Sequence, residues 1–426
     1  MEFVENIKLE EYEEFVKNSS KSHFMQSYYF GDVMKAKNYT PYYVGLKDNG
    51  KLVATALLLR KRLFKGVYYY YCPRGFVLDY KNLDLVGRFT KEIKTYAKKN
   101  HGIFVKIDPD IKRHDLDADG NILGNDNYDL INKLLSLGYV HKGYNIDFVN
   151  EQPRFTFRLN LEDDFDKIYS RMHATTRKIL NKKNQYNLDT YIGEMKDIPD
   201  FYITMHETAQ RENLGCNPIT YYEQFYGLLN KQGMSDLYVV KVHMNELRNM
   251  YKTKMDDLVA KIEYQKEHPL QNKQKNDNKI KEFENEYNKL NKDMDIIKEV
   301  KEDELVLSSI ITVKYGDKVW TVHGGNTTQL RFLNSNYWLY YTIIKDAYDQ
   351  GYKTIDFFGT SGLANPPKDS PIFGIHLFKK RLGGEYNEFI GEFDLVTSPF
   401  MYFLYNTIIP LRRKIVKARL RKNNKD

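Results

Sequence analysis

The stretch Gly102–Pro109 reads GIFVKIDP, and the first half of the chain is best understood outward from it. Its apolar run has the length of a buried strand, and an acid and a proline end it. Three β-rich runs and a helix-period segment precede it, at residues 41–47, 52–60, 67–71 and 83–99. Turn signals separate the β-rich runs, so the sequence predicts an antiparallel meander followed by a helix and a strand.

The second half of the chain repeats this order. Strands are predicted at 236–242, 305–315 and 319–323, a helix at 338–350, and a last short strand in Tyr352–Gly359, which reads YKTIDFFG. The repeat favours two copies of one α/β unit over one large sheet. Two further helices, at 9–18 and 28–37, precede the first copy.

An insertion interrupts the second copy. Its apolar residues alternate spacings of three and four, as in the seam of a coiled coil, at Ile280, Phe283, Tyr287, Leu290, Met294 and Ile297. A companion stripe runs from Leu247 to Ile262, and a breaker zone around Pro269 separates the two. We expect two antiparallel helices that form a protruding arm, with a substrate contact and an inert spacer or oligomerisation hairpin as alternative roles.

Composition narrows the class of protein. The 426 residues include 65 Lys and Arg against 57 Asp and Glu, and the net charge of +8 suits an anionic partner. Cys72 and Cys216 are the only cysteines, which excludes a disulfide framework and argues against a structural zinc site. The sequence has neither a signal-peptide pattern nor a run of about 20 apolar residues that could span a bilayer. We therefore expect a cytoplasmic protein.

Several catalytic motifs are missing from the sequence. It contains no GxxxxGK[ST] loop, no GxSxG elbow and no HExxH pair, which disfavours hydrolysis through a covalent serine or a zinc ion. The repeated order of elements resembles the GNAT acyltransferase fold, in which a glycine-rich turn holds the pyrophosphate of coenzyme A. No R-x-x-G-x-[GA] turn precedes either candidate helix, so we expect an acyl donor other than coenzyme A, and neither cofactor nor metal.

Two basic segments suggest anionic partners. Residues 171–183 contain no acid and five basic residues, namely Arg171, Arg177, Lys178, Lys182 and Lys183. A helix there could neutralise phosphates, or it could present only a solvated cationic face. The C-terminal segment joins the aromatic run PFMYFLY at 399–405 to seven basic residues between Arg412 and Lys422. This pattern fits a peripheral contact with an anionic membrane surface, and a docked helix with a frayed tail is the alternative.

Six ordered stretches carry a family resemblance. They are SHFMQ at 22–26, PRGFVLDY at 73–80, FVKIDP at 104–109, QPRF at 152–155, FKK at 378–380 and FIGEF at 389–393. In these stretches, in their order and in the position of the arm, the chain resembles the FemABX peptidoglycan aminoacyltransferases. The resemblance covers essentially the whole chain.

This resemblance implies an α/β fold of two GNAT-like domains, the second with an inserted coiled-coil arm. The expected divisions are 1–152 for the first domain, 153–242 and 304–398 for the second, 243–303 for the arm, and 399–426 for the aromatic and basic end. The arm itself is similar to the tRNA-binding arm of seryl-tRNA synthetase, which is an analogy of shape.

The resemblance also implies an activity. The family transfers an amino acid, here Gly, Ala or Ser, from aminoacyl-tRNA to the side-chain amine of the third stem-peptide residue of a peptidoglycan precursor. The implied acceptor is lipid II or the soluble UDP-MurNAc-pentapeptide, and the implied place is the inner face of the membrane. A homologous transferase is a further implied partner. The basic residues Arg177, Lys178, Lys182 and Lys183 are then expected to contact tRNA.

Substrate-binding roles follow residue by residue from the resemblance. Lys35 corresponds to a lysine that contacts the precursor's phosphates, Tyr39 lies near an aromatic residue of the same site, and Tyr221 corresponds to a tyrosine of the precursor pocket. Where relatives have an arginine this chain has Asn217, and Arg211 is the nearby substitute. A surface lysine, a core tyrosine and a helix-end charge are the alternative readings of Lys35, Tyr221 and Arg211.

Catalytic roles are implied for two residues. Asp108 corresponds to an acid that orients or deprotonates the attacking amine, and Lys379, beside Phe378, to a lysine that stabilises the oxyanion. Aminolysis of an ester needs a neutral amine, which a carboxylate can help to produce. A fixed ammonium group beside the carbonyl stabilises the charge that attack creates. The alternatives are an Asp-Pro turn that closes a strand and one of three basic residues on an exposed turn.

Two other functions stay open on the sequence alone. One is a GNAT-like N-acyltransferase that uses a different acyl donor. The other is a tRNA-binding adaptor without catalysis, for which Asp108 and Lys379 would be dispensable. In the duplicated fold we expect these two residues to face one cleft between the domains.

Overall fold

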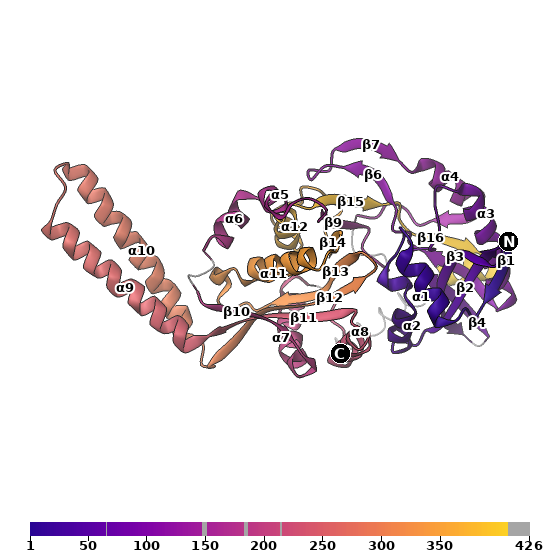
Figure 1. Ribbon diagram of the computed structural model, residues 1–426, viewed down its shortest axis with the longest axis horizontal. Coiled ribbons are helices and arrows are strands. Elements are labelled where there is room, and N and C mark those ends of the chain that lie inside the picture. Colours follow the sequence, from indigo (N-terminus) through magenta and orange to yellow (C-terminus); the bar gives the residue numbers. More distant parts are fainter. Residues whose placement is uncertain (65, 147–150, 183–185, 214, 408–426) are drawn as a thin grey trace, which may run out of the picture.

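The computed structural model describes residues 1–407 except 65, 147–150, 183–185 and 214. Lys183 and the basic residues between Arg412 and Lys422 therefore lie outside the described residues. The molecule is elongated, with two sheets in its body and a helical hairpin at one end (Figure 1).

The first sheet has seven strands. They lie in the order β1 (Glu2–Glu5), β2 (Thr40–Asp48), β3 (Lys51–Phe64), β4 (Val67–Cys72), β5 (Gly102–Ile107), β16 (Phe393–Val396) and β8 (Tyr139–His141). The predicted meander is β2 to β4, whose strands pair antiparallel. Helix α3 (Leu83–Lys99) then returns the chain so that β5 pairs parallel with β4, because a parallel pair needs such a crossover.

The second sheet has nine strands. They lie in the order β10 (Leu188–Gly193), β11 (Ser235–His243), β12 (Glu304–Tyr315), β13 (Lys318–Asn326), β14 (Thr354–Gly359), β9 (Phe155–Asn160), β15 (Glu385–Phe389), β6 (Lys112–Leu116) and β7 (Ile122–Asp126). Strands β11 to β13 form an antiparallel meander, helix α11 (Ser335–Asp349) follows, and β14 pairs parallel with β13. The repeated order predicted from the sequence is confirmed.

The two sheets exchange strands across the expected division of the chain. Strands β6 and β7 come from the first 152 residues, yet β6 pairs with β15 in the second sheet. Strand β16 follows the second domain in sequence, yet it pairs with β5 and β8 in the first sheet. Each sheet is therefore completed by chain from the other half.

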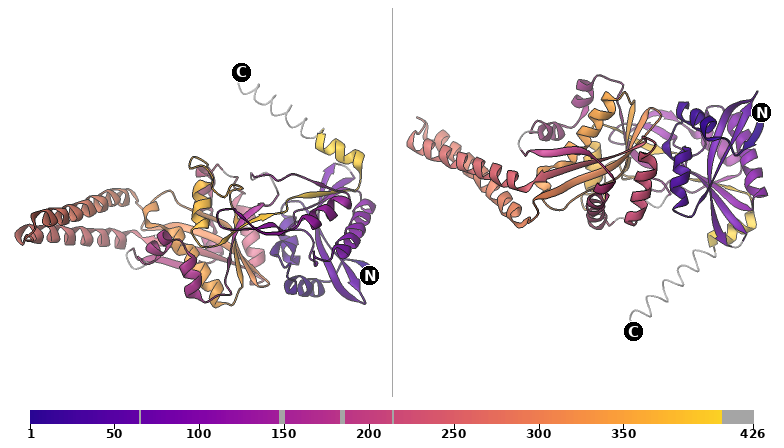
Figure 2. Two further views of the ribbon diagram at one scale, coloured as in Figure 1. Left: turned by 90° about the horizontal axis from the view of Figure 1, so that it is seen from above. Right: turned by 60° about the horizontal axis from the view of Figure 1, so that its bottom comes forward.

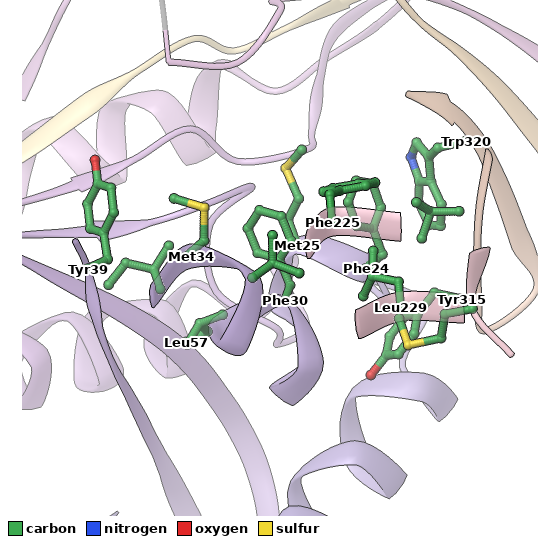
Figure 3. Close-up of a cluster of buried hydrophobic side chains, with 14 of the residues drawn as sticks. Phe24, Met25, Phe30, Met34, Tyr39, Leu57, Phe225, Leu229, Tyr315 and Trp320 are labelled. Atoms are coloured by element: carbon green, nitrogen blue, oxygen red, sulfur yellow. The ribbon is translucent and has the colours of Figure 1, made fainter. Parts of the chain in front are cut away.

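A shared apolar core joins the two sheets. The N-terminal elements α1 (Leu9–Asn18), η1 (Phe24–Gln26) and α2 (Tyr28–Lys35) contribute one side of it, and α8 (Ile219–Asn230) with β12 and β13 the other. Figure 3 shows this cluster, in which the Phe24 and Trp320 rings lie 5.2 Å apart. The Tyr315 hydroxyl also donates a hydrogen bond to Glu13, at 2.9 Å. The domains thus bury side chains against each other along this face.

The remaining helices cover the sheets. They are α4 (Tyr128–Ser136), α5 (Phe165–Arg171), α6 (Ala174–Leu180), η3 (Met195–Asp197), α7 (Ile198–Arg211), η4 (Arg331–Leu333) and α12 (Phe373–Lys380). The basic segment at 171–183 is therefore not one helix. The His173 ring accepts a hydrogen bond from the Thr175 N–H at 3.2 Å, so it caps a new helix after α5 ends.

The inserted arm consists of α9 (Met244–Glu267) and α10 (Lys273–Glu299), which pack against each other and project from the body (Figure 1). The predicted apolar stripe of α10 is its least exposed face, and Met294 and Ile297 at its base are fully buried with Leu247 and Tyr251 of α9. Near the free end, the Gln265 side-chain amide donates to Asn276 at 2.7 Å.

The described chain ends in a helix over residues 399–407 on the first domain, far from the arm (Figure 2). Tyr402 and Tyr405 pack on Phe104, with ring centroids 5.4 and 5.3 Å away. Phe400 and Phe403 are 70% and 62% exposed. No helix in the described part of the chain is long and apolar enough to cross a membrane.

Candidate active site

A pocket of about 490 Å³ opens in the second domain, within the size range of small-ligand sites. Its wall combines the end of α7, the ends of β13 and β14, the start of α11, and α12. Three of the sequence-predicted residues line it together, namely Arg211, Phe378 and Lys379. The repeated meander, helix and strand of the second domain thus place these side chains around one cavity.

Lys379 is buried in the wall of this pocket. Its ammonium group donates to the backbone carbonyl of Gly359, at 2.6 Å. Burial lowers the pKa of Lys379 to about 8, and the negative charge of Asp356 acts in the opposite direction. An ammonium group has three donors, so a lysine bonded to one carbonyl can still donate to a second acceptor in the pocket.

Rings and cations make up much of the remaining wall. The Phe378 ring packs edge-on against Tyr337 and Tyr340, with centroids 5.0 and 4.9 Å apart. Arg211 donates to the Asn326 side-chain oxygen at 2.8 Å and pairs with Glu212, which is also in the wall, at 2.9 Å. Arg331 lines the pocket as well. Such a wall suits a ligand with a planar ring and a negative charge.

The start of α11 faces the same pocket. Asn334, Ser335 and Asn336 line it, and Asn334 occupies the N-cap position with a left-handed φ of 56° and no side-chain capping bond. The first N–H groups of a helix lack partners within the helix, and the helix dipole makes this end positive. The pocket therefore attracts anions from two directions, from its side chains and from its backbone.

Asp108 lies outside the pocket wall, just after β5 in the first domain, and it is buried. Its carboxylate accepts hydrogen bonds from the Tyr71 hydroxyl at 2.8 Å and the Arg74 N–H at 2.6 Å. Burial raises the pKa of Asp108 to about 7, although the Arg74 cation acts against this. Arg74 in turn donates to the carbonyl of Pro153, a residue of the pocket wall, at 3.1 Å. Asp108 is thus linked to the pocket wall through Arg74 and Pro153 but is not part of it.

Lys35, the predicted phosphate-binding lysine, does not line the pocket. It is exposed and pairs with Asp32 at 2.6 Å within helix α2. Its neighbour Lys37, which the sequence pattern did not single out, lies with its ammonium group 4.1 Å from the ring centroid of Tyr221. Helix α2 ends at Lys35, and Asn38 then adopts a left-handed φ of 61°, which turns the chain sharply. A helical reading of residues 28–37 could not show this turn.

Lys61 extends this cationic group. Its ammonium group lies 4.5 Å from the ring centroid of Tyr39, whose hydroxyl is 3.0 Å from that of Tyr69. Burial and the positive charge of Lys61 both lower the pKa of Lys37. Tyr39 and Tyr221 are thus each covered by a lysine. We call Lys37, Lys61, Tyr39 and Tyr221 the lysine–tyrosine cluster.

Asn217 and the basic segment complete the predicted residues. Asn217 is half-buried, and its N–H donates to the Tyr222 hydroxyl at 3.3 Å. Arg177 donates to the Ser170 carbonyl at 2.7 Å, so it closes the end of α5, while Lys178 and Lys182 are exposed. None of these four side chains lines the pocket.

Lys182 lies close to the base of the arm. Burial lowers the pKa of Lys254 in α9, and the positive charge of Lys182 acts in the same direction. Lys182 and the half-buried Lys254 of the arm are therefore near enough for their charges to interact.

Comparisons with known proteins give one consistent result. The sequence model described as the FemAB family matches residues 7–409. Lipid II:glycine glycyltransferase of Staphylococcus aureus (strain MRSA252) is 26% identical over 425 residues, which is 98% of this chain and 97% of that protein. The protein of the same name from strain USA300 is similar to the same extent.

One solved structure is similar over nearly the whole chain. The crystal structure of FemX is similar over 95% of this chain and 99% of that chain, with a TM-score of 0.74 and 25% identity. A tandem GNAT protein from the clavulanic acid biosynthesis pathway is 8% identical over 93% of this chain, with a TM-score of 0.47. The match to FemX confirms the fold expected from the sequence.

Proposed function

The chain belongs to the FemAB family, and from this premise we propose that it transfers glycine from glycyl-tRNA to lipid II in the formation of the peptidoglycan interpeptide bridge. The name lipid II:glycine glycyltransferase, carried by relatives that match nearly the whole chain, favours glycine over alanine and serine, and lipid II over the soluble UDP-MurNAc-pentapeptide. The acceptor is the side-chain amine of the third stem-peptide residue.

The observation that carries the proposal is the buried Lys379 in the wall of a cationic, ring-lined pocket. In our proposal the 3′-terminal nucleotide of the charged tRNA enters this pocket, with its phosphate near Arg211 or Arg331. The ester carbonyl then lies beside Lys379. Attack by the amine forms the new C–N bond, the carbonyl oxygen becomes an oxyanion that Lys379 stabilises, and the ester C–O bond to the ribose breaks.

The acceptor binds on the side of the first domain. The lysine–tyrosine cluster offers two ammonium groups that interact with each other, which suits the diphosphate of the precursor. In our proposal Lys37, and not Lys35, contacts the precursor's phosphates. Asp108, with a pKa of about 7, does not line the pocket, so in its ionised form it orients the attacking amine through the Arg74 turn. The proton that the amine loses passes to the ribose oxygen, so the tRNA leaves with a free hydroxyl group.

The tRNA body contacts the basic residues at the end of α6 and just after it. Lys178 and Lys182 serve this role with Lys183, while Arg177 holds the segment in place. The arm, residues 244–299, contains twelve basic and twelve acidic residues, so its net charge is zero. We therefore propose that the arm contacts tRNA through complementary shape, and that the main attraction for the tRNA phosphates comes from other residues.

A membrane contact completes the proposal. Phe400 and Phe403 project from the helix over residues 399–407, and the sequence continues with seven basic residues between Arg412 and Lys422. Aromatic side chains with adjacent basic residues suit the surface of an anionic bilayer, where lipid II is anchored. The protein then acts peripherally at the inner membrane face, and a homologous transferase that adds the next residue is a candidate partner.

The test is an assay of transfer with purified protein. Glycyl-, alanyl- and seryl-tRNA are each supplied with lipid II or with UDP-MurNAc-pentapeptide, and acetyl-coenzyme A serves as the alternative donor. With each tRNA carrying its own radiolabelled amino acid, we expect label to enter lipid II from glycyl-tRNA and not from alanyl- or seryl-tRNA. Binding of charged tRNA without its consumption would instead identify an adaptor, and acetyl transfer would identify an ordinary N-acetyltransferase.

A further inference from the structure

The carbonyl that receives Lys379 is held by an unusual backbone. Gly359 follows Phe358, which has a φ of 61°. A bulky side chain rarely adopts this left-handed conformation, because its Cβ crowds the following carbonyl. Strand β14 also loses its regular register with β9 between Asp356 and Gly359. Phe358, Gly359 and Lys379 all line the pocket, so the strained peptide lies at the site itself.

Asp356 and Thr156 hold the backbone of Phe358 on both sides, at its N–H and at its carbonyl. The Phe358 N–H donates to the Asp356 carboxylate at 2.7 Å. The Thr156 hydroxyl lies 3.0 Å from the Phe358 carbonyl and also contacts the same carboxylate. Asp356 is buried and does not line the pocket, so it meets the reaction only through Phe358, Gly359 and Lys379.

Asp356 is itself fixed by a charge network between the two sheets. Arg158 donates to Asp356 at 2.8 Å and to Asp110 at 2.7 Å. Burial alone would raise the pKa of Asp110, but Arg158 and Lys21 hold it well below its usual range. The negative charge of Asp356 acts to raise the pKa of Lys379, against the effect of burial.

We infer that Asp356 is a positioning residue for Lys379: it fixes the backbone of Phe358, and thereby the next residue, Gly359, whose carbonyl receives the ammonium group, and it places a negative charge behind the pocket wall. The inference rests on the proposed function, in which Lys379 stabilises the oxyanion. Asp356 thus supports Lys379 from behind the pocket wall.

A titration without substrate tests the inference independently of the reaction. Carbon-13 NMR of labelled lysine, with Lys379 assigned by Lys379→Met, gives the pKa of Lys379 in the wild type and in Asp356→Asn. Removing an opposite charge should lower this pKa by about one pH unit or more. Asp236→Asn is the matched control, because Asp236 pairs with Lys314 at 2.6 Å in the same sheet and lies outside the pocket wall. An unchanged Lys379 pKa in Asp356→Asn overturns the inference.

Kinetics then connect the titration to the reaction. The single-turnover rate should fall on the alkaline side at a lower pH in Asp356→Asn than in the wild type, with little change in KM. Asp356→Glu, which keeps the charge, should keep most of the Lys379 pKa, and Asp356→Ser tests removal of the charge if Asp356→Asn does not fold. A loss of rate equal at every pH would show a purely structural role and contradict the inference. A wild type that titrates as expected but transfers no glycine would instead refute the proposed function.

Discussion

Asp108 and Lys379 are buried groups of opposite kind, and burial moves their pKa values toward each other, to about 7 and about 8. Asp108 is ionised above its pKa, and Lys379 is protonated below its own. Both groups are therefore in their active forms chiefly between these values. A bell-shaped dependence of kcat/KM on pH, with limbs near 7 and 8, is the expected result.

Two substitutions assign the acid limb. Asp108→Asn should abolish it, because no carboxylate remains to ionise. Tyr71→Phe should move it to higher pH, because the Tyr71 hydroxyl lowers the pKa of Asp108 by donating to its ionised form. The pH dependence of kcat/KM for both variants checks this. If Asp108→Asn keeps the acid limb of the wild type, another group is responsible and Asp108 leaves the mechanism.

Lys35 and Lys37 provide a matched pair. A contact with a charged group contributes about 1.5–3 kcal/mol, so Lys37→Met should raise the KM for lipid II by roughly tenfold or more. Lys35→Met should leave this KM unchanged, because Lys35 is exposed and paired with Asp32. Steady-state kinetics with lipid II at saturating glycyl-tRNA make the comparison. If Lys35→Met raised this KM more than Lys37→Met did, Lys35 would be the phosphate contact that the resemblance implies.

At the scale of elements, α6 and the arm make separable contributions to tRNA binding. Lys178→Glu with Lys182→Glu should raise the KM for glycyl-tRNA and flatten its dependence on salt, because fewer counterions are released on binding. Lys279→Glu with Lys281→Glu on the arm is the control with the same change in charge. Measurement of KM at several salt concentrations decides between them. An equal or larger effect from the arm pair would make the arm the principal tRNA contact.

Secondary structure was largely predictable from local sequence, because it depends on periodicity and turns. The strands of both meanders, α3 and α11 match their predicted positions within a few residues, and the two arm helices contain the predicted apolar stripes. Local sequence patterns did not predict the features that depend on tertiary contacts. The His173 cap divides the basic segment, and the pairing of β16 with β5 joins residues nearly 300 positions apart, which no short-range signal reports.

Site residues were predictable only in part, for the same reason. The resemblance located Lys379, Phe378 and Arg211, and the structure brings them to one pocket. The duplicated fold led us to expect Asp108 in one cleft with Lys379, whereas Asp108 is not part of the pocket wall and reaches it through Arg74 and Pro153. Lys37 and Asp356 carried no sequence signal, since the first depends on a left-handed turn at Asn38 and the second on a strained peptide at Phe358.

The whole molecule has its arm at one end and the helix over residues 399–407 on the domain at the other (Figure 2). Phe400→Ser with Phe403→Ser should weaken binding to anionic vesicles, because two aromatic side chains no longer enter the bilayer surface. Ile122→Ser with Leu123→Ser on β7 is the control, since those side chains are 65% and 69% exposed. Vesicle sedimentation measures both. Equal binding by the wild type and the phenylalanine variant would remove the membrane contact from the proposal.

The central claim is that the pocket of the second domain holds the reacting ester beside Lys379. The most direct measurement is the single-turnover rate of glycyl transfer by Lys379→Met, with Lys380→Met as the neighbouring control that pairs with Asp119 at 2.7 Å. Loss of the oxyanion contact predicts a rate lower by roughly 10²-fold or more for Lys379→Met, with little change in KM and a normal rate for Lys380→Met. A wild-type rate from Lys379→Met would contradict the claim.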